Sequence, residues 1–208
     1  AVELEEQILP EAAAVLVPVG GGGLLAGIAT WVRSRFPGVK IYGVEPKGAA
    51  SMHAALEEGE IVSLPKVDPF VDGTAVGRAG DLPYSVVREL VDDILVVPEG
   101  AVCTEMLDLY HSDGVIAEPA GALASAAARM YFADPEQRSQ LLGDASGALV
   151  AVVSGGNNDM TRYAEIMERS LRHEGLRHYF LVTFPQQPGA LRSFLEDVLG
   201  PGDDIVHF

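Results

Sequence analysis

The chain has 208 residues, 48% of them apolar, which is enough to bury one good core and to begin a second. Its 14 basic and 30 acidic residues give a formal net charge of −16, which excludes nucleic acid and anionic membranes as favoured partners. The single cysteine, Cys103, excludes an internal disulfide, and the five histidines show no metal-ligand spacing. No apolar run approaches the roughly 20 residues that span a bilayer. We therefore expect a cytoplasmic protein.

Strand-like and helix-like stretches alternate along most of the chain. This alternation is typical of an α/β fold in which helices cover both faces of an open, mostly parallel sheet. Pro119 suits the first turn of a helix, and Gly114 suits the end of one. The predicted strands are residues 15–19, 40–44, 93–97 and 149–153, and the clearest predicted helices are residues 24–36, 99–111 and 119–132.

The pattern changes near residues 172–177, where a charged stretch precedes an alternating strand over residues 179–184. Leu191, Phe194, Leu195 and Val198 then form an apolar stripe that would pack a helix onto a sheet. We predict one domain over residues 1–172 and the opening β-α-β of a small α+β domain over residues 173–208. The alternative is a terminal hairpin and helix that extend the first domain.

The sequence at both ends of the chain indicates a piece of a longer protein. The chain begins without Met in what reads as an amphipathic helix, and residues 205–208 read as the start of a strand.

Four consecutive glycines, Gly20 to Gly23, lie between the first predicted strand and the first predicted helix. Such a turn places backbone N–H groups at a positively polarised helix N-terminus, which can hold a phosphate without a cation. A side chain at Gly22 is expected to occupy the space where the backbone meets the phosphate. The alternative is a tight turn, although one or two glycines would suffice for that.

Ser154 follows the last predicted strand and precedes Gly155, Gly156 and what reads as a further helix. Ligands of open parallel sheets lie outside the carboxyl ends of the strands, so Ser154 and the glycine loop are expected to face one crevice. A serine hydroxyl can donate to a ring nitrogen and leave it neutral. The alternative role of Ser154 is a helix N-cap.

Several motifs, in the same order, resemble the threonine dehydratase (biosynthetic threonine ammonia-lyase) family. They are the glycine-loop segment 17–27, Gly-Val-Glu-Pro at 43–46, Asp-Gly-Thr-Ala-Val at 72–76, Val-Asp-Asp at 91–93, Ala-Glu-Pro-Ala-Gly-Ala at 117–122 and Ser-Gly-Gly-Asn at 154–157. The resemblance covers about residues 1–170 and implies fold type II of the pyridoxal-phosphate enzymes. Residues 177–208 resemble the first part of the family's ACT-like regulatory domain.

The resemblance implies a function and a cofactor. A family member would use pyridoxal 5'-phosphate to deaminate threonine, and also serine in some members, by β-elimination. Threonine would give 2-oxobutanoate and ammonia, a step of isoleucine biosynthesis. It also implies an amino-acid substrate, isoleucine as an allosteric ligand, and a homo-oligomer, either a dimer or a tetramer.

The resemblance also implies roles for individual residues. Gly20 to Gly23, with Leu24, match the loop that holds the cofactor phosphate, and Ser154 matches the serine that faces the pyridine nitrogen. Glu118 matches an acidic residue on the wall of the site, with a role in orienting the ligand or in proton transfer, although a carboxylate there would also complement a helix N-terminus. Glu45 matches a cation-binding position of related serine racemases, but their second carboxylate is Ser51 here, which makes a metal site doubtful.

The Schiff-base lysine of the family has no counterpart in this chain. Lys40, Lys47 and Lys66 are the three lysines, and none of them lies in a matching motif. The chain by itself is therefore expected to be inactive, as the second half of a catalytic domain would be.

Two further classes remain open. Residues 21–26 also fit the glycine fingerprint of a nicotinamide-dinucleotide-binding oxidoreductase, with Glu45 near the expected acidic position. That interpretation leaves the Ser-Gly-Gly-Asn motif without a task. The other class is a non-catalytic amino-acid-sensing module built on the ACT-like end.

Overall fold

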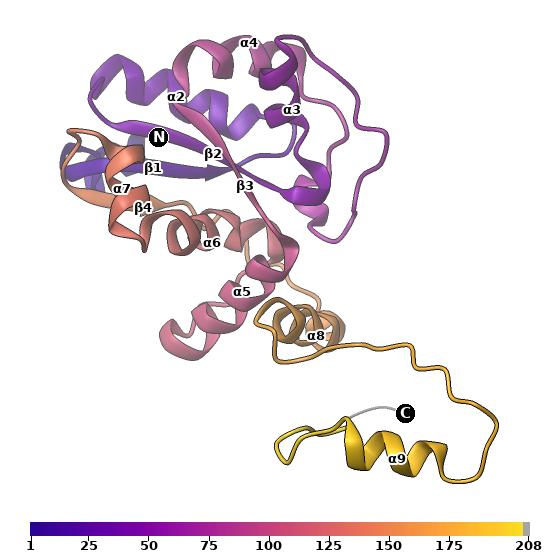
Figure 1. Cartoon of the computed structure of the whole chain (residues 1–208). Helices are drawn as coiled ribbons and strands as arrows, with labels where there is room; N and C mark the ends of the chain where they lie inside the picture. Colours follow the sequence, from indigo (N-terminus) through magenta and orange to yellow (C-terminus); the bar gives the residue numbers. More distant parts are fainter. Residues whose placement is uncertain (206–208) are drawn as a thin grey trace. The chain divides into compact units, whose positions relative to one another are not determined.

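The computed structural model describes residues 1–205, with the exception of the Leu9 side chain (Figure 1). It divides into two units, Ala1–Arg177 and His178–Phe208. Each unit is described by itself below.

The first unit is built on a parallel sheet. Within the described residues its strands are β1 (Ala12–Pro18), β2 (Lys40–Pro46), β3 (Asp93–Val97) and β4 (Ala148–Ala151), in the order β3-β2-β1-β4. Every neighbouring pair is parallel, with Val15 opposite both Ile41 and Val150. The predicted α/β class and all four predicted strands are confirmed.

Helices cover both faces of this sheet (Figure 1). The predicted helix over residues 119–132 is observed with these bounds, and Gly114 ends α5 in the left-handed conformation, with a φ of 68°. The helices of the first unit are α1 (Val2–Gln7), α2 (Gly23–Arg35), α3 (Ser51–Glu58), α4 (Asp81–Leu90), α5 (Glu99–Asp113), α6 (Pro119–Phe132), α7 (Pro135–Leu142) and α8 (Tyr163–His173).

The two faces of the sheet carry separate apolar cores. Along β1, Val15 and Val17 pack with α2, α3 and α4, while Ala14 and Leu16 pack with α5 and α6 on the other face. All of these side chains are fully buried. Successive strand residues point to opposite faces, so a strand covered on both sides needs a continuous apolar run, as residues 12–17 provide.

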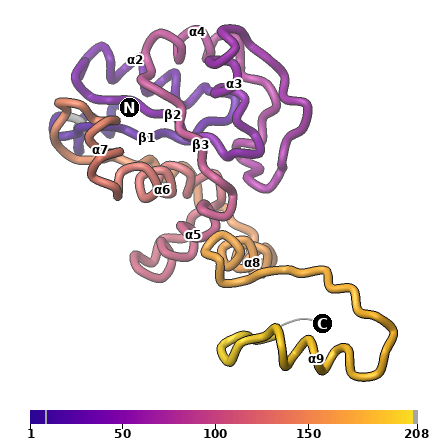
Figure 2. Tube along the Cα trace, viewed as in Figure 1, coloured from indigo at the N-terminus to yellow at the C-terminus, as the bar shows by residue number. Residues whose placement is uncertain are grey.

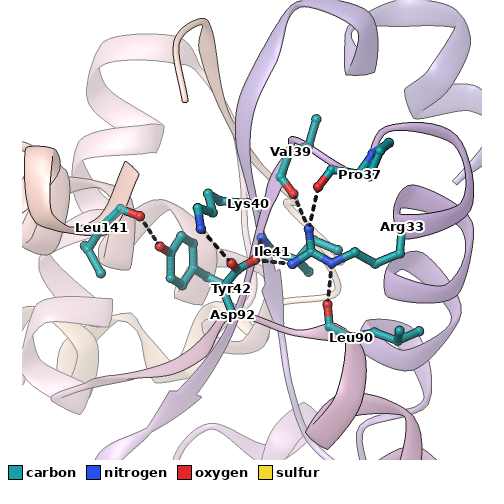
Figure 3. Close-up of polar contacts among 9 residues, drawn as sticks. All are labelled: Arg33, Pro37, Val39, Lys40, Ile41, Tyr42, Leu90, Asp92 and Leu141. Carbon is teal, nitrogen blue, oxygen red and sulfur yellow. Dashed lines mark hydrogen bonds and ion pairs between the residues drawn. The ribbon is translucent and has the colours of Figure 1, made fainter. Parts of the chain in front are cut away.

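The amino ends of the strands are held by a polar network (Figure 3). Asp92 accepts hydrogen bonds from the Ile41 backbone N–H at 2.8 Å and from Lys40 Nζ at 3.0 Å, and it also pairs with Arg33. Arg33, near the end of α2, donates to the Leu90 carbonyl oxygen at 2.7 Å. This network joins α2, β2 and the start of β3. It lies at the end of the sheet opposite the cavity described below.

The second unit contains α9 (Ala190–Asp197) and otherwise lacks regular structure within its described residues. The predicted strand over residues 179–184 is wrong for this structure: the segment is extended coil, because a strand needs a hydrogen-bonded partner and none pairs with it among residues 178–205. Phe194 packs edge-on against Phe184 with ring centroids 5.4 Å apart, but Leu191 and Leu195 remain about 40% exposed, so the predicted packing of the stripe on a sheet is not observed. The predicted strand over residues 205–208 lies almost wholly outside the described residues.

Candidate functional site

A cavity of about 230 Å³ opens where the strand order of the sheet reverses. The chain passes from β1 to β2 on one side, whereas β4 returns to the other side of β1. Open α/β sheets bind ligands at such a switch point, outside the carboxyl ends of the strands. The lining residues come from several segments and are Pro18, Gly20, Gly21, Gly22, Gly23, Leu24, Gly73, Thr74, Glu118, Ala120 and Ser154.

The glycine loop forms the turn from β1 into α2. Gly22 is the N-cap residue, with a left-handed φ of 89°, and its carbonyl oxygen accepts the first helical hydrogen bond from Ala26 N at 2.9 Å. A β-carbon at Gly22 would lie 2.5 Å from Met52 Cε and 2.9 Å from Pro83 Cβ. A side chain at Gly22 would therefore meet α3 and α4 first, and the expectation that it would meet the phosphate gains no support from this geometry.

The open positions of the loop are Gly21 and Gly23. A β-carbon at either position would meet no heavy atom within 4 Å among the described residues, and both residues line the cavity. Gly20 is the packed end, because a β-carbon there would lie 3.2 Å from Thr74 Cα. The four glycines thus serve two needs: close packing at Gly20 and Gly22, and exposed backbone at Gly21 and Gly23.

The electrostatics of the loop favour an anion. The first N–H groups of a helix have no intrahelical partner and carry partial positive charge. The first turn of α2 contains no acidic residue, and Arg33 and Arg35 occupy its last turn. None of the residues that line the cavity in the described chain is a lysine or an arginine. Within this chain a phosphate would therefore be held chiefly by backbone N–H groups, without a basic side chain.

Ser154 lies on the cavity wall beyond β4, with an exposed side chain. The helix predicted directly after it is not observed. Residues 152–159 are coil, and the next turn begins at Met160 under a different cap, in which Asp159 Oδ1 accepts from Thr161 N at 2.8 Å. The N-cap alternative for Ser154 is thereby excluded, and its hydroxyl is available to a ligand.

Glu118 is the N-cap residue of α6, but its side chain makes no capping hydrogen bond within the described residues. Its backbone N–H donates to the Gly155 carbonyl oxygen at 3.1 Å. A β-carbon at Gly155 would lie 2.2 Å from Glu118 Oε1, and one at Gly121 would lie 2.2 Å from the Gly155 oxygen. These glycines let the Ser154–Asn157 loop lie directly on the N-terminus of α6, so the half-buried Glu118 carboxylate and Ser154 share one wall.

Glu45 lies elsewhere, on β2, and is fully buried. Its carboxylate oxygens each accept a 2.8 Å hydrogen bond at the start of α3, from Met52 N and from His53 N. Burial raises the pKa of this carboxyl group to about 7, although the backbone hydrogen bonds oppose the shift. No group of three metal-ligating side chains occurs among residues 1–205. The structure thus shows Glu45 tying β2 to α3.

The three lysines, all of which are described, lie outside this cavity. Lys40 pairs with Asp92 at the amino ends of the strands. Lys47 and Lys66 line a second cavity of about 550 Å³. Cys103 is fully buried, and burial raises the pKa of its thiol to about 12, so it does not supply a nucleophile either.

Besides Pro18 and Ala120, two lining residues, Gly73 and Thr74, were not predicted as site residues. The Asp-Gly-Thr-Ala-Val motif that contains them contributed to the resemblance, and it is the signal that could have identified them. Thr74 is buried beside Gly20, and a β-carbon at Gly73 would lie 2.8 Å from Ala120 Cβ. This segment, 72–74, closes the side of the cavity between the glycine loop and α6.

The fold and the site define an open, parallel α/β protein with a glycine loop at a helix N-terminus and a serine at its switch point. The chain belongs to the pyridoxal-phosphate dependent enzyme family, whose model matches residues 1–158. Residues 168–208 match the C-terminal regulatory domain of threonine dehydratase. The family and the cofactor class predicted from the sequence are confirmed, and these matches give no support to the nicotinamide alternative.

Characterised relatives agree with this assignment. The chain is 55% identical over 197 residues to the biosynthetic L-threonine dehydratase of Corynebacterium glutamicum, covering 93% of this chain and 43% of that protein. It is 53% identical over 210 residues to the enzyme of the same name from Mycobacterium leprae, covering 100% and 47%. The chain therefore spans about half the length of these relatives.

Solved structures show the same fold. Threonine deaminase isoform 2 of Solanum lycopersicum, in its processed form, superposes with a TM-score of 0.72 at 36% identity, over 81% of this chain and 47% of that one. Maize serine racemase superposes with a TM-score of 0.69 at 35% identity, over 83% of this chain and 50% of that one.

Among residues 1–205, no helix is both long and apolar enough to cross a bilayer.

Proposed function

We propose that this chain supplies the cofactor-phosphate and ring-facing part of a cytoplasmic, pyridoxal-phosphate dependent threonine dehydratase. The reaction is the deamination of threonine, with serine as a second substrate, to a 2-oxo acid and ammonia. The observation that carries the proposal is the convergence of the glycine loop, Ser154 and Glu118 on one cavity, although nearly 100 residues separate the loop from Glu118 along the chain.

The residues of the cavity fit the cofactor. Gly20 to Gly23 and Leu24 would hold its phosphate at the N-terminus of α2, and Ser154 would donate a hydrogen bond to its ring nitrogen. When bound, pyridoxal phosphate withdraws electrons from the substrate's α-carbon and so makes the α-proton acidic. A serine at this place keeps the ring nitrogen neutral, which moderates the electron withdrawal and favours direct loss of the β-hydroxyl group over transamination.

Glu118 is the one titratable side chain among the described residues that line the cavity. We assign it to the substrate, either to orient it or to carry a proton. Its position beside Gly155 places it on the same wall as Ser154. Replacement by glutamine separates the two roles, because an amide keeps the shape and one acceptor but cannot take up a proton at neutral pH.

We further propose that residues 1–172 form the second half of a catalytic domain. The start of a regulatory domain would follow from residue 173. The half-length coverage of the relatives supports this division, as does the match of residues 168–208 to a regulatory model. The lysine that holds the cofactor would come from the segment that precedes this chain. A regulatory domain implies an effector, for which isoleucine is the candidate, and the complete enzyme is expected to be a homo-oligomer.

The test uses the polypeptide at its natural length. We expect a mass about twice that of this chain, cofactor absorbance in the purified protein, and formation of 2-oxobutanoate from threonine. Borohydride treatment of the isolated 208-residue chain with pyridoxal phosphate should label none of Lys40, Lys47 and Lys66 stoichiometrically. A specific adduct on one of these three lysines would contradict the proposed division, and binding of a nicotinamide dinucleotide instead would contradict the function.

A further inference from the structure

Two arginines of the α8 region contact the ring of Phe70. The Arg169 guanidinium carbon is 4.0 Å from the centre of the Phe70 ring, and that of Arg162 is 4.9 Å from it. The ring itself is only 3% exposed. A guanidinium group within about 6 Å of an aromatic face is attracted by the ring quadrupole, and more strongly where water is excluded. We call Arg162 and Arg169 the arginine clamp.

The clamp also holds the backbone and the acidic residues on either side of Phe70. Arg162 donates to the Phe70 carbonyl oxygen at 2.6 Å and lies 3.7 Å from Asp72 Oδ2. Arg169 lies 3.9 Å from Asp68 Oδ2. Two cations therefore fix residues 68–72 through the ring, a carbonyl group and two carboxylates.

The far end of the clamped segment is the cavity wall. Directly after Phe70 the chain enters the turn η3 (Asp72–Thr74), whose Gly73 and Thr74 line the cavity. The turn is short and internally bonded, with Thr74 N donating to the Val71 carbonyl oxygen at 3.0 Å. A displacement of Phe70 must therefore move Gly73 and Thr74, which lie against Ala120 and the glycine loop.

The helix that carries Arg169 is itself firmly packed. In Figures 1 and 2, α8 lies beside α5. A β-carbon at Gly100 of α5 would lie 2.6 Å from His173 Cβ, and the Thr104 and Ser170 hydroxyl groups are 2.9 Å apart. Ile166 is fully buried in the same interface. Close packing against α5 therefore restricts the position of α8 and of Arg169 on it.

Arg169 of the clamp also connects the two family matches. The match to the pyridoxal-phosphate dependent enzymes ends at residue 158, and the match to the regulatory domain begins at residue 168, inside α8. Arg169 thus belongs to the regulatory match, while Phe70 and the cavity wall belong to the enzyme match. This is a direct side-chain contact between the two.

We propose that Arg162 and Arg169 are positioning residues, which hold the Gly73–Thr74 wall of the cavity in place through their contacts with Phe70. A change in the position of α8 would then alter that wall, and a change in the wall would alter α8. The identity of the ligand rests on the proposed function, whereas the positioning does not. Coupling between two sites is reciprocal. Cofactor binding at the wall should therefore be sensed in α8.

The first test is hydrogen exchange in the natural-length protein without added cofactor. Arg169→Gln should speed amide exchange across residues 70–76, because it removes the charge above the ring. Arg169→Lys should restore little, because an ammonium group lacks the plane that stacks on Phe70. Arg138→Gln, on the exposed surface of α7, is the matched control and should leave exchange there unchanged. Unchanged exchange in the Arg169→Gln protein at an unchanged melting temperature would overturn the positioning role.

The second test adds pyridoxal phosphate. We expect Arg169→Gln and Phe70→Leu each to weaken cofactor binding by about threefold to tenfold. The double variant should lose clearly less than the sum of the two, because both substitutions remove the Arg169–Phe70 contact. Cofactor should also slow exchange in α8 of the wild-type protein but not in the Arg169→Gln variant. Additive effects, or no response of α8 in the wild type, would overturn the coupling. Failure of the wild type to bind the cofactor would instead overturn the proposed function, and the first test would still decide the positioning.

Discussion

A methyl group at Gly23 separates the two possible roles of the glycine loop. Gly23 is the first residue of α2 and lines the cavity, and an added β-carbon would meet no described heavy atom within 4 Å. Gly23→Ala should therefore cause no clash with the described residues. It would, however, place a methyl group beside the N–H groups that we assign to the cofactor phosphate. Gly22→Ala is the comparison, because the methyl group at that position would face the protein.

The two substitutions should change the free energy of unfolding in opposite directions. Alanine is better than glycine in a helix, so Gly23→Ala should leave stability unchanged or raise it by up to about 1 kcal/mol. Gly22 has a φ of 89°, which costs a residue with a β-carbon roughly 1–2 kcal/mol. The contacts of 2.5 Å with Met52 and 2.9 Å with Pro83 add to that cost. Gly22→Ala should therefore be the destabilised variant.

Thermal melts of the natural-length variants, combined with cofactor titrations followed by absorbance, test this expectation. We expect Gly23→Ala to melt no lower than the wild type and yet to bind pyridoxal phosphate at least about tenfold more weakly, a loss of about 1.4 kcal/mol. A Gly23→Ala protein that melts normally and retains full cofactor affinity would refute the phosphate site and reduce the loop to a turn.

Substitutions at four further positions test other parts of the structure. Ser154→Asp should reduce elimination and increase transamination products, whereas Ser154→Ala should mainly reduce rate, as measured by product analysis; equal stability losses without these changes would argue against the ring-nitrogen role. Glu118→Gln should abolish 2-oxobutanoate formation if the carboxylate moves a proton, but only raise the KM for threonine if it orients the substrate. Burial raises the pKa of Glu45 from 4.5 to about 7, so folding favours the protonated form of this carboxyl group. The free energy of unfolding should therefore fall as the pH rises from 4.5 to 7. Glu45→Gln should remove this pH dependence, as measured by urea titrations. Burial by itself would raise the pKa of Asp92, but the hydrogen bonds from Ile41, Lys40 and Arg33 outweigh it and hold the pKa below 3.8. Asp92→Asn should therefore destabilise the protein near pH 7. The destabilisation should be smaller in acid, where the wild-type carboxylate becomes protonated.

The elements that sequence reasoning predicted well are those fixed by short-range patterns. A strand inside a parallel sheet is buried on both faces and needs an apolar run, so β1 could be predicted from its local sequence. Pro119 and Gly114 mark helix ends through their own backbone preferences. The glycine loop belongs to the same group, because a strand, a glycine turn and a helix are consecutive in the chain.

The features that sequence reasoning missed depend on contacts between distant segments. The expected helix after Ser154 is displaced, because Gly155 lies directly on the N-terminus of α6, and this contact is set by Gly121 far upstream. The orientation of Gly22 toward Met52 and Pro83 likewise follows from how α3 and α4 pack. The predicted strand over residues 179–184 had a correct alternating pattern, but a pattern does not supply the neighbour to which a strand must bond.

The two ends of the sheet differ in the polar groups that they present. At the amino ends, Asp92 binds Arg33, Lys40 and the Ile41 N–H, so the charged side chains there hold the sheet and α2 together. At the carboxyl ends, the cavity presents backbone N–H groups and one carboxylate, with no basic side chain among the described lining residues. In a chain of net charge −16 a phosphate gains nothing from the overall field, which repels it, so its binding must come from groups within a few ångströms. Helix N–H groups meet that need, and they keep their partial positive charge at any pH because they do not titrate.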